Sequence, residues 1–333
     1  PPDFRDKFPP PNFTVAVGGG HYVNDRPFDP LNRVPGDGYE IFGAILEKQP
    51  HLMLWLGNTV HLREADWYSR SGLADRYRRG REIPALQPLL GSVPHVATWS
   101  AHDYGPANAN RRYIGKQWVH ELFQQYWPNP THGITGDIPG VATRLRWSDV
   151  DIFLLDDRYH RDLTAKPPSR RTVYGPEQLD WLLDALAASP ASFKLVCTGS
   201  PVLNPAEHPD NFSAAEEERA RFIEALKARE IEGVVFLAGG RRYGEMTKMV
   251  RAGAYDLYEV AVGPLTARPD AGTDELNYFR VPVTATFERH FVLLDIFGTE
   301  DDRKLRVSLH LTDGTEAWNR TLEANAMRFN AAA

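Results

Sequence analysis

Six short apolar runs, each ending in small or polar residues, constrain most strongly what this chain can fold into. They are FTVAVGGG (13–20), LMLWLGN (52–58), HVATWSAHD (95–103), VDIFLLDDR (150–158), FKLVCTGSP (193–201) and GVVFLAGG (233–240). Continuous apolar runs are typical of central strands that are covered on both faces. We therefore predict buried strands, and we expect ligands to bind beyond their carboxyl ends.

Helical patterns separate several of these runs, and the end of the chain is rich in strands. Helices are predicted over 39–49, 175–189 and 213–230, and the last is acidic at its start and basic at its end, as the helix dipole favours. The last third alternates apolar and polar residues with period two, and Asp313-Gly314 is a hairpin signal. This order predicts an α/β sandwich built on a mixed sheet.

Composition excludes several classes of function. A chain of 333 residues with 42% hydrophobic content can bury a full core, and its net charge of −6 argues against a nucleic-acid-binding protein. The single cysteine, Cys197, permits neither an internal disulfide nor a cysteine-based metal site. No apolar run is long enough to predict a membrane span. The chain begins at Pro1 without a methionine, which leaves a removed export signal open.

Six motifs in order carry a resemblance to a known family. LMLWLGNTVHLREADW, HVATWSAHDYGPAN, VDIFLLDDRYHR, GVVFLAGGRRYGEM, YEVAVGPLT and FERHFVLLDIFG resemble those of the alkaline phosphatase D (PhoD-like) family of the metallophosphoesterase-like superfamily. The resemblance implies a four-layer α/β/β/α sandwich of two mixed β-sheets. We expect one domain over 1–333, with 1–12 as an extended lead-in and 275–318 as C-terminal strands of the same sandwich. It also suggests an extracytoplasmic location.

The family uses a metal centre, and this sequence departs from the family at the positions of the metal ligands. The bridging Asp after the second strand is Asn58, and the Asp pair after the third strand is Ser100 and Ala101. The late Asp-x-His becomes Gly240 and Arg242. Metal centres of this kind need anionic oxygen and imidazole ligands, whereas a guanidinium has no lone pair for a cation. We therefore expect no bound metal and no cofactor.

The retained residues suggest a site that works without metal. His102, oriented by Asp103, is a candidate acid–base pair, and His61 adds a second group that can titrate near neutral pH. Arg242 is expected to point inward and stabilise negative charge, whereas Arg241 is expected to point outward. In the alternative interpretation, the His102–Asp103 pair only maintains the strand end. The predicted substrate-binding residues are Asn58, Ser100, Tyr104, Asp157, Arg158 and Tyr243.

Three functions follow from these expectations. The first is an enzyme that acts without metal on a small polar or anionic substrate. The second is a catalytically inactive pseudophosphatase that binds a ligand or a protein partner. The third is a metal-dependent phosphatase or phosphodiesterase whose ligands come from loops outside the motifs. Ser100 is also a candidate nucleophile with His102 as its base, although the chain has no Gly-x-Ser-x-Gly elbow.

Overall fold

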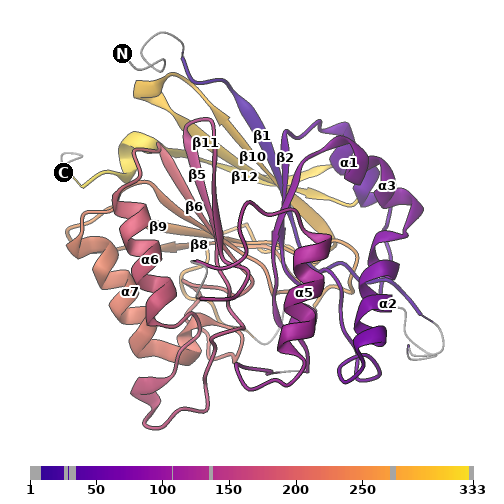
Figure 1. Ribbon diagram of the computed structural model, residues 1–333. Helices are drawn as coiled ribbons and strands as arrows, with labels where there is room; N and C mark the ends of the chain where they lie inside the picture. The colour runs from indigo at the N-terminus through magenta and orange to yellow at the C-terminus, as the bar shows by residue number, and fades with distance from the viewer. Residues whose placement is uncertain are drawn as a thin grey trace, which may run out of the picture.

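Two six-stranded mixed sheets pack face to face, and helices cover the outer face of each (Figure 1). The computed structural model describes residues 9–25, 29, 35–106, 108–134, 138–270 and 275–329. The predicted α/β/β/α sandwich is confirmed. Residues 1–8 of the expected lead-in lie outside the described residues.

The first sheet combines the start and the end of the chain. Its order is β12-β11-β10-β1-β2-β3, in which β1, β2 and β3 are parallel and β10, β11 and β12 are added antiparallel beside β1. The late strands therefore complete the sheet that the first strand begins. The strands are β1 (Phe13–Gly18), β2 (Leu52–Leu56), β3 (His95–Thr98), β10 (His290–Phe297), β11 (Lys304–Leu311) and β12 (Glu316–Glu323).

The middle of the chain forms the second sheet. Its order is β4-β5-β6-β7-β9-β8, with β5, β6, β7 and β9 parallel and the two edge strands antiparallel to their neighbours. The strands are β4 (Thr143–Trp147), β5 (Val150–Leu154), β6 (Phe193–Thr198), β7 (Val234–Ala238), β8 (Glu245–Met249) and β9 (Leu257–Ala261).

The helices form the two outer layers. Those before residue 130 pack beside the first sheet, and the two later ones pack beside the second (Figure 1). They are α1 (Ile41–Glu47), α2 (Arg70–Arg81), α3 (Gln87–Ser92), α4 (Ala101–Tyr104), α5 (Lys116–Tyr126), α6 (Pro176–Ala187) and α7 (Glu216–Ala228). Short 3-10 turns lie at Pro84–Leu86, Pro168–Arg170, Phe212–Ala215, Glu300–Asp302 and Ala324–Met327. None of the helices in the described ranges has the length and apolarity that a membrane crossing requires.

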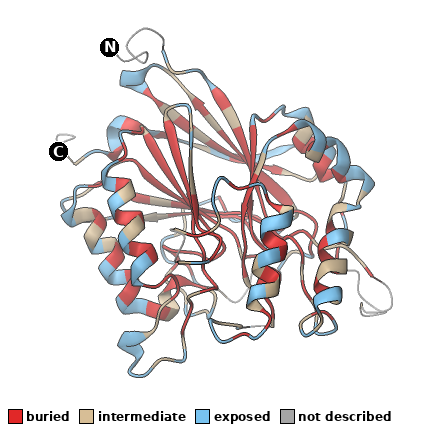
Figure 2. Ribbon diagram, viewed as in Figure 1, coloured by how far each residue is buried: buried red, intermediate tan, exposed pale blue. Residues whose placement is uncertain are grey.

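Alternating side chains divide the strands between two cores. Val15 and Val17 of β1 lie in the core between the sheets, whereas Ala16 belongs to the core under α1 to α5. Figure 2 shows the central strands of both sheets buried along most of their length, whereas β12 at the edge of the first sheet is largely exposed. The apolar runs are continuous because both strand faces are covered, as the sequence predicts.

One predicted strand is shorter than expected. The alternating segment 279–298 forms a strand only from His290, and its first half makes isolated bridges at Arg280 and Thr286. Pro282 has no N–H to donate to a ladder, and Val283 adopts a positive φ of 63°. A regular strand therefore cannot pass through this part of the segment.

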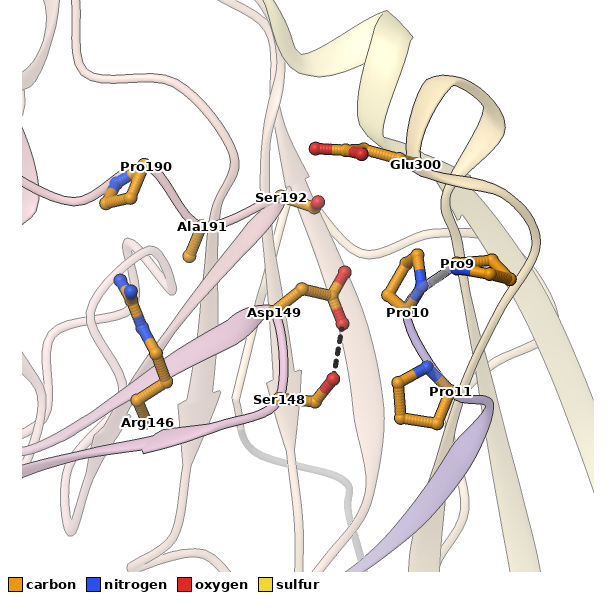
Figure 3. Close-up of a pocket in the computed structure, with 10 residues that line it drawn as sticks. All are labelled: Pro9, Pro10, Pro11, Arg146, Ser148, Asp149, Pro190, Ala191, Ser192 and Glu300. Carbon is orange, nitrogen blue, oxygen red and sulfur yellow. Dashed lines mark hydrogen bonds between the residues drawn. The ribbon is translucent and has the colours of Figure 1, made fainter. Parts of the chain in front are cut away.

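The amino ends of the strands are held together by a buried arginine. The Arg303 guanidinium donates to the Asp149 carboxylate at 2.9 and 3.0 Å and to the carbonyl oxygens of Pro11 and Gly298 at 2.6 and 2.8 Å. These contacts join the chain before β1 to the β4–β5 turn and to the β10–β11 connection. A cavity of about 430 Å³ lies beside them, with Pro9 to Pro11 facing Asp149 (Figure 3).

We predict that Arg303→Ala destabilises the protein by about 3–5 kcal/mol, because it leaves Asp149 and several carbonyl groups without their partner. The matched control is Arg306→Ala in β11, whose side chain is 32% exposed and pairs with Asp295 and Glu316. We expect it to cost less than about 1 kcal/mol. Urea unfolding followed by circular dichroism measures both. Equal losses in the two variants would contradict this account.

Candidate functional site

A cleft of about 770 Å³ opens at the carboxyl ends of the strands. Its walls come from the start of α4 after β3, the loop after β6, the turn after β7 and the segments around residues 270 and 276. This is the end at which open α/β sheets bind ligands. The titratable side chains that line it are His102, Glu207, His208, Asp210, Arg241, Arg242, Tyr243, Asp270, Glu275 and Tyr278.

Asp103 builds the floor of the site and does not orient His102. Its carboxylate accepts hydrogen bonds from the backbone N–H groups of residues 58–60 and of Ser100, and from the Thr59 hydroxyl. None of the hydrogen bonds found in the described residues joins it to the His102 ring. The expected His102–Asp103 acid–base pair is therefore wrong in its geometry. Asp103 is 1% exposed and ties the loop after β2 to the start of α4.

The side chain of Asn58 holds the backbone of His102 in place. Asn58 adopts a left-handed φ of 52°, and its Oδ1 accepts from the His102 N–H at 2.9 Å. The side chain is 6% exposed, so it fixes the loop more than it lines the cleft. His102 lies in the first turn of α4, and its exposed ring lines the cleft. Its ring nitrogens accept or donate no hydrogen bond within the described part of the chain.

His61 lies directly behind His102. The two rings stack with centroids 4.5 Å apart and an angle of 16° between their planes. His61 Nδ1 lies 3.2 Å from the His21 carbonyl oxygen, which can only accept, so Nδ1 carries the proton. Burial lowers the pKa of His61 well below its usual value, and the neighbouring His102 lowers it further. Of the two imidazoles, only His102 borders the cleft.

The electrostatic surroundings also favour neutral His102. The protein atoms packed around the ring lower its pKa; Asp210 opposes this shift, while Arg158 and Arg242 add to it. Protonation of His102 would place a further positive charge near these two arginines. His102 is therefore expected to be neutral at pH 7, with one nitrogen able to accept a proton.

Two predicted substrate-binding residues are buried away from the cleft. The Ser100 hydroxyl donates to the Gly199 carbonyl oxygen at 2.8 Å, and the residue is fully buried. Ser100 also caps α4, so the chain turns into a helix where an extended strand end was expected. Tyr104 is 0% exposed and packs against Trp99 and Tyr113. Neither reaches a ligand in the cleft, and Ser100 is not placed as a nucleophile.

Asp157 and Arg158 are buried behind the wall of the cleft. Both side chains are 0% exposed; Asp157 accepts from the Ser200 hydroxyl, and Arg158 donates to Asp210 at 2.8 Å. Their predicted role in direct substrate contact is therefore not supported by this arrangement. Arg158 acts on the site through Asp210, because the guanidinium holds the pKa of that carboxyl far below its usual range despite the opposing effect of burial.

The two arginines after β7 have the reverse of the predicted orientation. The Arg241 side chain is 7% exposed and donates to Glu275 at 3.0 Å and to Asn211 at 2.5 Å. The Arg242 side chain is 46% exposed at the edge of the cleft, 3.8 Å from Asp270. Gly240 precedes them with a φ of 76°, which interrupts the strand's alternation. The prediction took both orientations from the family motif, and the turn at Gly240 places the two side chains differently.

Tyr243, predicted to bind substrate, lies in the lining of the cleft. It is 3% exposed, and its hydroxyl accepts from the Asn204 amide at 3.4 Å. Burial raises the pKa of the hydroxyl, and Glu245 and Glu275 raise it further. Tyr243 therefore remains protonated and can only act as a neutral hydrogen-bonding group.

Sequence reasoning missed the loop after β6 and the segment at 275. His208, Asp210 and Glu275 all line the cleft, yet none belongs to a motif of the family resemblance. Their signal in the sequence was weak: a polar NPAEHPDN segment that begins at Asn204, where a buried strand has just ended. Only the folded chain brings Glu275 to this loop, through its hydrogen bonds from Asn204 and Asn211.

The positions at which the family resemblance led us to expect metal ligands hold hydrogen-bonded or closely packed groups. Asn58 Oδ1 and the Ser100 hydroxyl are engaged as described above, and a Cβ at Gly240 would lie 2.2 Å from the Gly199 carbonyl oxygen. In the described ranges, no three His, Cys, Asp or Glu side chains gather closely enough to hold a metal ion.

Comparisons with known proteins agree on the fold. Residues 32–295 match the sequence profile of a family described as PhoD-like phosphatase. The solved structure of PhoD matches with a TM-score of 0.73 at 15% identity, over 96% of this chain and 71% of that one. A purple acid phosphatase, PPD1 from yellow lupin (Lupinus luteus) seeds, matches with a TM-score of 0.68 at 11% identity, over 95% of this chain and 55% of that one. A search of curated proteins finds no match.

We predict that Asp103→Ala destabilises the protein by about 3 kcal/mol or more, because four backbone N–H groups lose a buried charged acceptor. Asp75→Ala is the control, since Asp75 only pairs with Arg78 and Arg79 on the surface of α2. We expect that change to cost less than about 1 kcal/mol. Denaturant unfolding at pH 7 compares the two. A small effect at Asp103 would mean that other contacts hold the loop.

We also predict that the protein loses stability as the pH falls below about 6.5. Burial lowers the pKa of His21 to about 3 and that of His290 to about 4, so the unfolded chain binds protons that the folded chain refuses. Each such histidine adds a loss of up to about 1.4 kcal/mol per pH unit until its folded pKa is reached. Urea unfolding from pH 7 to pH 5 measures this slope. His290→Gln should reduce it, because that variant no longer contains the buried imidazole.

Proposed function

The chain belongs to the PhoD-like phosphatase family, and from that premise we propose that it is a hydrolase-fold enzyme acting on a small polar substrate without the family's metal centre. The proposal rests on one observation. His102 presents an exposed imidazole to the cleft, and its ring nitrogens make no hydrogen bond with the described residues. A neutral imidazole in a polar cleft is the usual group for moving a proton near neutral pH.

The chemistry of the ligand positions supports the metal-free part of the proposal. The family's ligand set requires carboxylates, and the residues at those positions are Asn58, Ser100, Ala101, Gly240 and Arg242. The oxygens of Asn58 and Ser100 already have partners, and an aspartate at position 240 would collide with the backbone. These residues do not suit the family's metal centre, and no step of the proposed chemistry passes through one.

The roles in this chemistry differ from those expected at first. His102 takes a proton from the substrate or gives one to it. His61 supports the ring by stacking, and its low pKa keeps a second positive charge away from His102. Asp103 and Asn58 hold the backbone on which His102 is mounted. Arg242, at the edge of the cleft, is the guanidinium that can approach negative charge as it develops on a bound substrate.

The charges of the cleft favour a polar substrate over a strongly anionic one. Arg241 pairs with Glu275, Arg158 pairs with Asp210, and Arg242 lies 3.8 Å from Asp270. Each guanidinium is therefore at least partly compensated by a carboxylate. A phosphate or sulfate dianion would have to displace these carboxylates or lie beside them, whereas hydroxyl and carbonyl groups meet no such repulsion.

We predict that purified protein turns over a substrate in the presence of a chelator, and that His102→Ala lowers the rate by about 10²–10⁴-fold. The substrate panel contains phosphate esters, sulfate esters, glycosides and carboxyl esters. His51→Ala, on the surface, is the control that should retain full activity. Elemental analysis of the same sample is expected to find no stoichiometric metal.

Each outcome of this experiment separates one function from the others. Activity that the chelator abolishes and a divalent metal restores would support a metal-dependent phosphatase with displaced ligands. A protein that binds a panel compound without converting it would instead be a pseudophosphatase. Turnover that is unaffected by His102→Ala would overturn the assignment of the acid–base group.

A further inference from the structure

We propose that His208 is a fixed hydrogen-bond donor of the cleft, with its ring held as the neutral tautomer that carries the proton on Nε2. Arg241 is the positioning residue that selects this tautomer. This inference rests on the proposed function for its chemical role: His208 would donate a hydrogen bond to a ligand, whereas His102 would accept one. Its physical basis is independent of any turnover.

The contacts of His208 determine where its proton lies. Nδ1 is 3.0 Å from an Arg241 guanidinium nitrogen and 3.0 Å from the backbone nitrogen of Asp210. A guanidinium and a peptide N–H can only donate, so Nδ1 must be the acceptor. In a neutral imidazole the other nitrogen then carries the hydrogen. Nε2 has no hydrogen-bond partner in the described ranges, and the side chain is 39% exposed within the lining of the cleft.

Arg241 is itself held in place, so its donor cannot easily turn away. Its second terminal nitrogen donates to the Asn211 side-chain oxygen at 2.5 Å and to Glu275 at 3.0 Å. The same Glu275 oxygen accepts from the amides of Asn204 and Asn211. This network joins the loop after β6 to the turn after β7. The guanidinium therefore approaches His208 in one orientation.

The charges around His208 oppose a second proton. Arg241 faces Nδ1 directly, and Arg161 approaches the same loop by donating to the Pro209 carbonyl oxygen. Two carboxylates favour protonation, but each is engaged elsewhere: Asp210, 4.0 Å from Nδ1, binds Arg158, and Glu275 binds Arg241. Burial lowers the pKa of His208, and Arg241 lowers it further. The neutral donor is the form expected at pH 7.

The pair of imidazoles defines the ligand chemistry that the cleft suits. His208 offers an N–H, which an oxygen acceptor such as a carbonyl, ether or hydroxyl group can receive. His102 offers a nitrogen lone pair, which can take the proton of a hydroxyl group. A ligand that carries both an uncharged oxygen acceptor and a hydroxyl group matches both. This pairing was not visible in the sequence, because His208 lies outside the motifs.

Nitrogen-15 NMR of the ligand-free protein at pH 7 tests the tautomer directly. We expect the His208 ring to show an unprotonated Nδ1 and a protonated Nε2. Arg241→Gln should make the ring a mixture of tautomers, and the neighbouring Arg242→Gln should leave the wild-type pattern, because no hydrogen bond found in the described residues joins Arg242 to His208. A wild-type ring that carries its proton on Nδ1, or on both nitrogens, would overturn the proposal. The wild-type spectrum decides this even if Arg241→Gln fails to fold.

Chemical modification gives a second measurement. Diethyl pyrocarbonate reacts with an accessible imidazole nitrogen that has a free lone pair; His208 has its lone pair covered by two donors. We expect His208 to react at least about tenfold more slowly than His102, as measured by mass spectrometry of peptides, and to become reactive in Arg241→Gln. Equal rates for the two histidines in the wild-type protein would contradict the proposal. Neither measurement uses a substrate, so failure of the proposed enzyme would leave this result unaffected.

Discussion

The structure depends on a contact between the backbones of the two sheets at the carboxyl ends of their strands. A Cβ at Gly239 would lie 1.7 Å from the Leu56 carbonyl oxygen, and one at Gly199 would lie 2.2 Å from that of Trp99. Only glycine permits so close an approach. The contact brings the ends of β2, β3, β6 and β7 together, so the residues that follow these strands share one surface. Every part of the candidate site is arranged around it.

A buried carboxylate then shapes the loops that leave this contact. Asp103 gathers the N–H groups of residues 58–60 and of Ser100, which places Asn58 and the first turn of α4 side by side. The backbone N–H groups of Ser100 and His102 already have acceptors in Asp103 and Asn58, and the His102 ring is exposed at the cleft. Asp103 thus stabilises the fold, whereas His102, its neighbour in sequence, faces the cleft.

The cleft combines compensated charges with neutral imidazoles. Its arginines are paired with carboxylates from other loops, and the surrounding protein atoms together with nearby arginines lower the pKa of His102 and of His208. Such pairing fixes the geometry of these side chains and limits the net charge of the cleft. The cleft therefore offers hydrogen-bond donors and acceptors of fixed direction.

The sequence by itself predicted an α/β fold with buried strands, because apolar runs closed by small residues are typical of strands covered on both faces. The motifs of the family resemblance implied the four-layer sandwich, which the structure confirms. The sequence also pointed to His102 as a residue of the cleft, since His102 lies in a motif next to a strand end. It could not assign Asp103, Ser100 and Tyr104 to the interior or reverse Arg241 and Arg242, because one positive φ at Gly240 changes which side chain turns inward. The contribution of His208, Asp210 and Glu275 was decided only by tertiary structure: their loops are far apart in sequence, and hydrogen bonds made after folding bring them together.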